Sequence, residues 1–239
     1  MALANDCRCE FIDALRWVQY ARHHTDSFTL DLALLQDSIT FLFNQISANI
    51  GIFNERLPMC GIVGAVANRP VTPILLEGLK RLEYRGYDSA GISVLNPDLE
   101  SIRAAGKVDQ LVQQINNTPL AGAIGIAHTR WATHGEPCER NAHPHHSNNT
   151  VAIVHNGIIE NYSKLKQELI DQGYTFSSDT DSETIAHLLH HLLQSTPDPL
   201  QAIQQLRQKL QGAYALGILL KDQSNTIFAL RQGSPLVIG

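Results

Sequence analysis

The chain has 239 residues, of which 44% are hydrophobic and 17% are charged, and its formal net charge is -5. This composition supports an ordinary buried core and excludes a broadly disordered chain. The negative charge balance argues against a nucleic-acid-binding protein, which usually carries a basic surface. No apolar stretch is both long and uncharged enough for a membrane helix, so we expect a cytoplasmic protein that binds neither nucleic acid nor membrane.

The first 58 residues contain no recognisable motif. Residues 11–22 and 30–46 have apolar side chains at helical spacing and are joined by a polar turn at 23–27. Two interpretations stay open for residues 1–58: a helical extension, or upstream sequence included by a wrongly placed start codon. We predict that the principal domain covers residues 59–239.

From residue 60 onward, strand and helix patterns alternate. Short apolar runs predict strands at 61–66, 91–95, 122–127, 151–155, 214–220 and 226–230. Amphipathic spacing predicts helices at 73–82, 164–169, 184–193 and 200–210. The last two strands are separated by residues 222–225, which predicts an antiparallel hairpin. This order indicates a layered α/β or α+β architecture.

The dipeptide Met59-Cys60 stands out because the chain has only two methionines, Met1 and Met59. A cysteine that follows a methionine becomes the first residue once translation starts there and the methionine is removed. An N-terminal cysteine carries a thiol nucleophile and an α-amine base in one residue. The alternative is that Cys60 is a small buried residue, as most free cysteines are.

Four polar clusters lie in predicted loops or at predicted strand ends, where functional residues concentrate. They cover residues 82–91, 128–135, 155–157 and 178–183. Each also has a purely structural explanation: Asn156-Gly157 is a common tight-turn pair, the 178–183 cluster is typical of helix capping, and an ion pair can hold the turn within 82–91.

Together with Cys60, these clusters resemble the class II glutamine amidotransferases, which are N-terminal-nucleophile hydrolases. Within that class they resemble the branch that passes ammonia to fructose 6-phosphate in hexosamine synthesis. The resemblance rests on residues 60–64, 81–91, 128–135 and 155–161, which are spread over the whole segment. It implies an α+β fold, a four-layer αββα sandwich with two antiparallel sheets, which would be incomplete at its C-terminus if the chain stops at residue 239.

The resemblance also implies roles for individual residues. Cys60 attacks the side-chain amide of L-glutamine, while the amide of Asn156 and the backbone N–H of Gly157 stabilise the oxyanion. The remaining residues bind the substrate or control the ammonia, with these expected roles: Arg130 binds the carboxylate, Asp181 binds the ammonium, Thr133 and His134 form walls of the pocket, Arg85 orders the neighbouring loop, and Trp131 gates the passage of ammonia.

Histidines at 143, 145 and 146, with Cys138 nearby, raise the alternative of a metal site. Pro144 prevents a helical ligand pair, and no acidic partner stands at ligand spacing. The four cysteines, including Cys7 and Cys9, form neither a disulfide scaffold nor a zinc motif. We therefore expect no metal and no cofactor.

Two further expectations follow from the resemblance. The acceptor fructose 6-phosphate would bind to isomerase domains that this sequence does not contain, and the full-length family is expected to form a homodimer. A different-class alternative is a catalytically silent fragment or glutamine-binding module, because the Cys60 nitrogen is an amide when translation begins at Met1.

Overall fold

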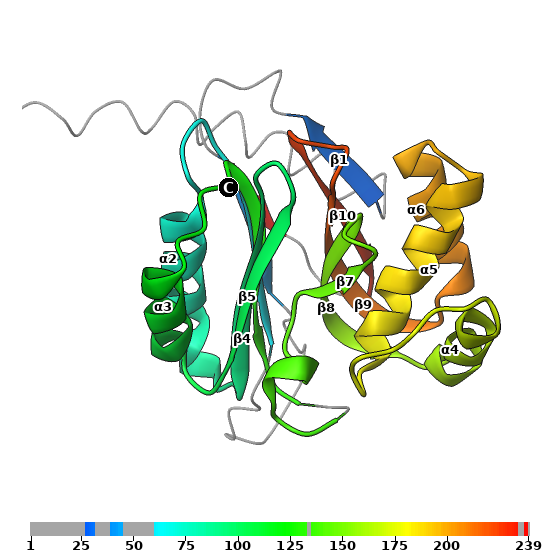
Figure 1. The fold of residues 1–239 in the computed structure, drawn as a ribbon, viewed down its shortest axis with the longest axis horizontal. Coiled ribbons are helices and arrows are strands. Elements are labelled where there is room, and N and C mark those ends of the chain that lie inside the picture. The colour runs from blue at the N-terminus through cyan, green and yellow to red at the C-terminus, as the bar shows by residue number, and fades with distance from the viewer. Residues whose placement is uncertain (1–26, 32–38, 45–59, 133–134, 234–236, 239) are drawn as a thin grey trace, which may run out of the picture.

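The computed structural model describes residues 27–31, 39–44, 60–132, 135–233 and 237–238. In this part of the chain, two antiparallel sheets pack face to face, and helices cover the outer side of each sheet (Figure 1). The layers are therefore helix, sheet, sheet and helix, which confirms the predicted α+β sandwich.

The first sheet, called sheet B, has the strand order β11-β2-β3-β6-β4-β5. Its strands, in chain order, are β2 (Ile39–Asn44), β3 (Gly61–Val66), β4 (Ser89–Leu95), β5 (Leu99–Ala105), β6 (Ile124–Arg130) and β11 (Val237–Ile238). Its outer face packs against α2 (Thr72–Leu82) and α3 (Val108–Asn117), and a short 3-10 helix, η2 (Glu83–Arg85), follows α2.

The second sheet, called sheet A, has the strand order β1-β10-β9-β8-β7. Its strands are β1 (Ser27–Asp31), β7 (His145–Ser147), β8 (Val151–Ile159), β9 (Gly212–Leu220) and β10 (Thr226–Gln232). The helices α4 (Tyr162–Asp171), α5 (Asp181–Ser195) and α6 (Pro199–Lys209) cover its outer face, and the 3-10 helix η3 (Glu139–Asn141) precedes β7.

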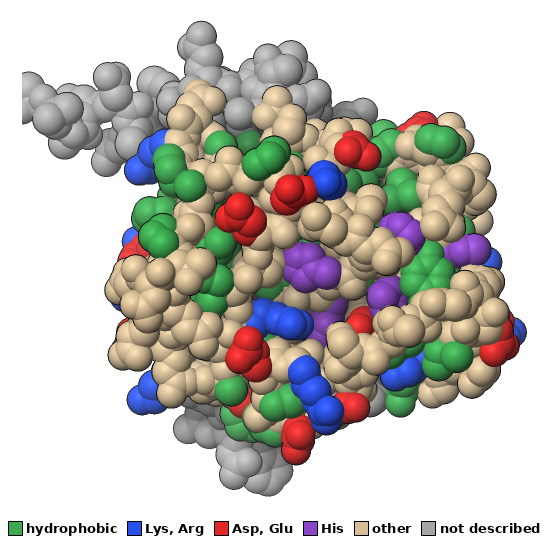
Figure 2. Space-filling model, in the orientation of Figure 1, with side chains coloured by type: hydrophobic (Ala, Val, Ile, Leu, Met, Phe, Trp, Pro, Cys, Tyr) green, Lys and Arg blue, Asp and Glu red, His purple; other side chains and the backbone are tan. Residues whose placement is uncertain are grey.

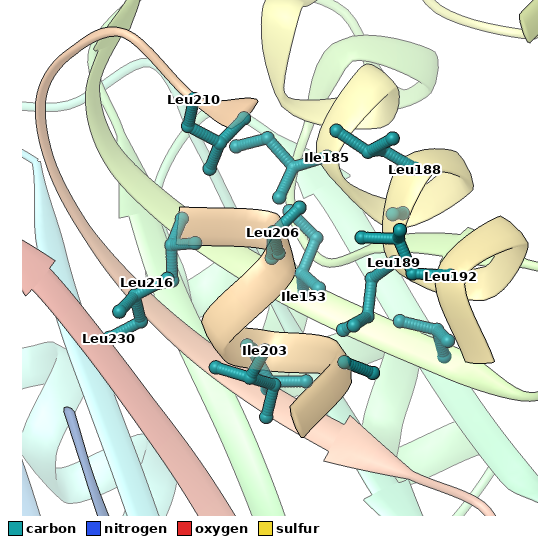
Figure 3. Close-up of a cluster of buried hydrophobic side chains, with 14 of the residues drawn as sticks. Ile153, Ile185, Leu188, Leu189, Leu192, Ile203, Leu206, Leu210, Leu216 and Leu230 are labelled. Carbon is teal, nitrogen blue, oxygen red and sulfur yellow. The ribbon is translucent and has the colours of Figure 1, made fainter. Parts of the chain in front are cut away.

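The core is divided into three parts by the two sheets. One hydrophobic cluster lies between α5, α6 and sheet A, where Leu189, Leu206 and Ile153 meet (Figure 3). A second fills the space between α2, α3 and sheet B. The third lies between the two sheets. Each sheet therefore buries both faces, which is why β3, β4 and β6 are buried along their whole length rather than alternating with exposed residues.

Most elements predicted after residue 60 are confirmed. The strand at 61–66 is exact, and the hairpin of β9 and β10 is antiparallel as expected. The helix predicted at 30–46 is wrong, because 27–31 and 39–44 are strands that pair with β10 and β3. The helix predicted at 11–22 lies outside the described residues. Among those that are described, no helix is long and apolar enough to cross a membrane.

Candidate active site

Strand alternation directs several polar side chains into the space between the sheets. On β3, Ile62 belongs to the inter-sheet cluster, and Cys60 lies two residues before it on the same side. On β6, Ile126 belongs to the same cluster, so His128 and Arg130 follow on that face. Ile62 pairs with His128 in the register of β3 and β6, so these residues meet at one end of sheet B.

Strand β8 supplies the opposite wall of this space. Val154 packs between the sheets, and Asn156, two residues on, points the same way. The side chain of His155 points to the opposite face of β8, toward α5, where its Nδ1 lies 2.8 Å from the hydroxyl of Ser182. The alternative explanation of Asn156-Gly157 as a tight turn is wrong, because both residues lie inside β8 and pair with β9.

Cys60 lies against the loop that follows β6 and against β8. The Trp131 N–H donates to its Sγ at 3.1 Å, and the Asn156 side-chain nitrogen donates to its carbonyl oxygen at 3.3 Å. Burial raises the pKa of the Cys60 thiol above its ordinary value, although the Trp131 N–H and the Arg130 charge oppose this. The thiol is therefore protonated at neutral pH and needs a base before it can attack.

Asp88 holds the loop that contains Trp131. Its backbone N–H donates to the carbonyl of Arg130 at 2.7 Å, and its carboxylate accepts from the N–H of Ala132 and from the hydroxyl of Ser89. The same carboxylate lies 3.9 Å from the buried guanidinium of Arg130. Asp88 thus fixes the backbone on both sides of Trp131, a role that the sequence did not reveal, although the residue lies in the 82–91 cluster.

Asp181 is buried at the start of α5, next to the end of β8. Its carboxylate accepts from the Ile159 N–H at 2.9 Å and from the Ser182 hydroxyl at 3.3 Å. Thr180 caps the helix by accepting from the N–H of Glu183. A carboxylate in the first turn also interacts favourably with the helix dipole. Asp181 therefore has a structural role here, and ammonium binding stays a prediction.

The other predicted site residues are placed less fully. Thr133 and His134 lie outside the described residues. Arg85 is the last residue of η2. Trp131 is 43% exposed although its backbone contacts Cys60, so its ring is accessible at the rim of the site. Cys60, Arg130, Trp131 and Asn156 are brought together, whereas no contact joins Asp181 to Cys60 within the described part of the chain.

A chain of buried histidines extends from the site between the sheets. Nε2 of His128 lies at hydrogen-bond distance, 2.7 Å, from Oδ1 of Asn156. The ring centroids of His128 and His143 are 4.3 Å apart, and those of His143 and His145 are 4.7 Å apart. Burial lowers the pKa of His128 and of His145 to about 3. Figure 2 shows histidine side chains in a hollow near the middle of the face seen in Figure 1.

These histidines are not arranged as metal ligands. Among the described residues, no group of three or more histidine, cysteine, aspartate or glutamate side chains is placed to hold a metal ion. His145 Nε2 instead lies 3.0 Å from the hydroxyl of Thr180, and His146 Nε2 lies 2.6 Å from that of Ser101.

Comparisons with known proteins identify similar sequences and folds. Residues 128–237 match the family described as "Glutamine amidotransferase domain". The match includes Arg130, Trp131 and Asn156, which lie around Cys60.

Curated relatives with similar sequences extend the match to most of the chain. A glutamine–fructose-6-phosphate aminotransferase (isomerizing) of Pseudomonas syringae pv. tomato is 58% identical over 183 residues, or 76% of this chain and 30% of the relative. A protein of the same name from Legionella pneumophila is 53% identical over the same shares. The chain thus spans less than a third of the length of these relatives.

Solved structures support the fold. The glutamine phosphoribosylpyrophosphate amidotransferase from B. subtilis matches with a TM-score of 0.55 and 20% identity, over 84% of this chain and 46% of the other. An allosteric regulatory enzyme of purine biosynthesis matches equally well, at 22% identity. The sandwich is therefore a fold that this chain shares with these two enzymes.

Proposed function

We propose that this chain is the glutaminase part of a glutamine–fructose-6-phosphate aminotransferase. It hydrolyses L-glutamine, and in the longer protein the ammonia reaches fructose 6-phosphate to form glucosamine 6-phosphate. The observation that carries this proposal is the setting of Cys60, whose thiol accepts from the Trp131 N–H and whose carbonyl oxygen accepts from the Asn156 amide. The 58% identity to a relative of that name supports the choice of acceptor.

The chemical step uses the two reactive groups of an N-terminal Cys60. The α-amine takes the thiol proton, and the sulfur forms a bond to the side-chain carbonyl carbon of glutamine. An α-amine has an unperturbed pKa of about 7.7–8.0, which suits a base near neutral pH. The α-ammonium then returns the proton to the leaving nitrogen as the carbon–nitrogen bond breaks and ammonia leaves. Water hydrolyses the resulting thioester to glutamate.

Each residue around Cys60 has a proposed role in binding glutamine or in stabilising the reaction intermediate. Asn156 Nδ2 and the Gly157 N–H stabilise the negative oxygen of the tetrahedral intermediate. Arg130 offers a planar guanidinium to the substrate carboxylate, and Asp181 offers a carboxylate to its ammonium. Thr133 and His134 complete the pocket, Arg85 orders the adjoining loop, and the exposed ring of Trp131 controls the escape of ammonia. We also propose that the protein acts in the cytoplasm and that the longer protein forms a homodimer.

The test must free the Cys60 amine without removing the strands that precede it. We would replace residues 56–59 with a factor Xa recognition sequence, fold the whole chain, and then cleave directly before Cys60. We expect glutamate and ammonia to be released from glutamine only after cleavage. The uncut chain and the cut Cys60→Ala variant are the matched controls.

The outcomes separate the enzyme from a silent binding module. Turnover by the cut parent, with none by either control, supports the proposal. Glutamine binding without turnover in the cut parent would contradict it and would favour the binding module.

A further inference from the structure

The amide of Asn156 has two chemically opposite ends, and only one of them can stabilise an oxyanion. The NH2 end donates hydrogen bonds, whereas the carbonyl end would repel a negative oxygen. Whether the site is competent therefore depends on what holds this amide in one orientation.

Two neighbours of Asn156 determine that orientation. On one side lies the carbonyl oxygen of Cys60, 3.3 Å from Nδ2, and a carbonyl oxygen can only accept. The NH2 end must therefore face Cys60, and Oδ1 must face the other way. On that other side, Oδ1 lies 2.7 Å from Nε2 of His128. An amide oxygen can only accept, so Nε2 of His128 must carry the proton.

We propose that His128 is a positioning residue for glutamine hydrolysis, whose Nε2–H holds Oδ1 of Asn156 so that Nδ2 points at the reaction centre. This inference rests on the proposed glutaminase function and deepens it. His128 has no contact with substrate in this role, and it acts through Asn156 alone.

The environment of His128 favours this tautomer. The residue is fully buried, and Nδ1 has no hydrogen-bond partner within the described residues, whereas Nε2 has Asn156. A buried N–H without an acceptor is costly, so the proton is more stable on Nε2. Burial lowers the pKa of His128 to about 3, although the bond to Asn156 opposes this, so the ring is neutral and has a single N–H.

The opposite tautomer would turn the amide around. With the proton on Nδ1, the bare Nε2 would accept from the NH2 end of Asn156. The carbonyl end would then face the Cys60 carbonyl and the developing oxyanion, with no hydrogen between the oxygens. The tautomer of His128 and the orientation of Asn156 therefore change together.

The kinetic test uses the cleavable full chain and two substitutions. His128→Gln places an amide N–H near the position of Nε2, and His128→Leu has similar size but no donor. We expect His128→Leu to lower kcat by about 10²-fold, close to the loss of an oxyanion donor, with KM changed only a few-fold. His128→Gln should retain kcat within about tenfold of the parent, because it restores one donated hydrogen bond. Equal losses in both variants, or an unchanged kcat in His128→Leu, would overturn the inference.

A double-mutant cycle shows whether His128 acts through Asn156. Asn156→Ala removes the donor that His128 positions, so adding His128→Leu to it should cost almost nothing more. Multiplicative losses would mean that His128 acts independently, and would contradict the proposed role.

A second readout needs no activity and no cleavage. Long-range proton–nitrogen NMR on the uncut chain with 15N-labelled histidine identifies tautomers, and the signal missing in His128→Gln assigns His128. We expect a neutral ring with the proton on Nε2. A proton on Nδ1 would overturn this inference and leave the proposed function standing, whereas a cut parent without turnover would contradict the proposed function, on which the inference rests. If His128→Leu fails to fold, the NMR result on the parent still decides the matter.

Discussion

The dipeptide Asn156-Gly157, a pair that is common in turns, lies inside a strand in this structure. Gly157 lies inside β8 with φ of 132°, a region that favours glycine. A Cβ at this position would lie 2.2 Å from the carbonyl oxygen of Ala213, which belongs to the adjacent strand β9. The backbone next to Asn156 is therefore possible only because residue 157 has no side chain.

Gly157→Ala should destabilise the fold strongly. The new methyl group meets backbone atoms of β9 that cannot rotate away, in addition to the cost of the positive φ, which is about 1–3 kcal/mol. Gly173→Ala is the matched control, because Gly173 also has a positive φ of 90° but nothing within 4 Å of the added Cβ. Urea unfolding should show a clearly larger loss for Gly157→Ala. Similar losses of unfolding free energy in the two variants would mean that the close approach of Gly157 to β9 does not contribute to the destabilisation.

At the residue scale, the resemblance predicted the groups around Cys60 but not those that support them. Cys60, Arg130, Trp131 and Asn156 were all predicted, and they lie together. The roles of His128 and Asp88 depend on which strands pair and which face each residue takes, as in the register of β3 with β6. Distances between residues remote in sequence are set by that register, which periodicity alone does not provide.

At the element scale, β7 and its neighbours carry several histidines that must be neutral in the folded state. Burial lowers the pKa of His145 to about 3 and of His146 to about 4, and it lowers the pKa of His143 well below its ordinary value. The same cause lowers the pKa of His128. In the unfolded chain these rings take up protons near pH 6.5.

Stability should therefore fall on mild acidification. Above about pH 6.5 both states are neutral at these rings and their full contribution is present, whereas at lower pH the unfolded state binds more protons. Below about pH 5.5 each ring costs about 1.4 kcal/mol per pH unit, until the folded pKa is reached. Urea unfolding between pH 7.5 and 5 measures this slope. His146→Gln should reduce it by the share of one ring, and an unchanged slope would contradict the assignment.

The elements that the sequence did not reveal have weak or ambiguous patterns. Strand β7 is three residues long and contains two histidines, so it has no apolar signal. Helix α3 is the exception, because Val108, Leu111 and Ile115 have a clear helical spacing. Residues 39–44 fit a helical face, but their β-branched and aromatic side chains also favour a strand, and pairing with β3 decided the outcome.

At the scale of the whole molecule, both sheets extend to strands that precede Cys60 in the chain. β2 lies between β11 and β3, and β1 pairs with β10 at the end of sheet A. Freeing the Cys60 amine breaks the chain between these strands and the rest of the fold. Without β2, the backbone of β3 would become a sheet edge with unpaired N–H and C=O groups.

Residues 1–59 should therefore stay bound after cleavage before Cys60. The hydrogen bonds of β1 and β2 do not depend on the covalent link, so the two pieces should co-elute in size-exclusion chromatography at micromolar concentration. Their thermal midpoint should be lower than that of the uncut chain and should rise with protein concentration, because unfolding now separates two chains. The contrary result is a separate peak for residues 1–59 beside a monomeric remainder with the midpoint of the uncut chain. In that case β3 and β10 would tolerate exposure as edges, and the strands before Cys60 would contribute nothing to the stability of the sandwich.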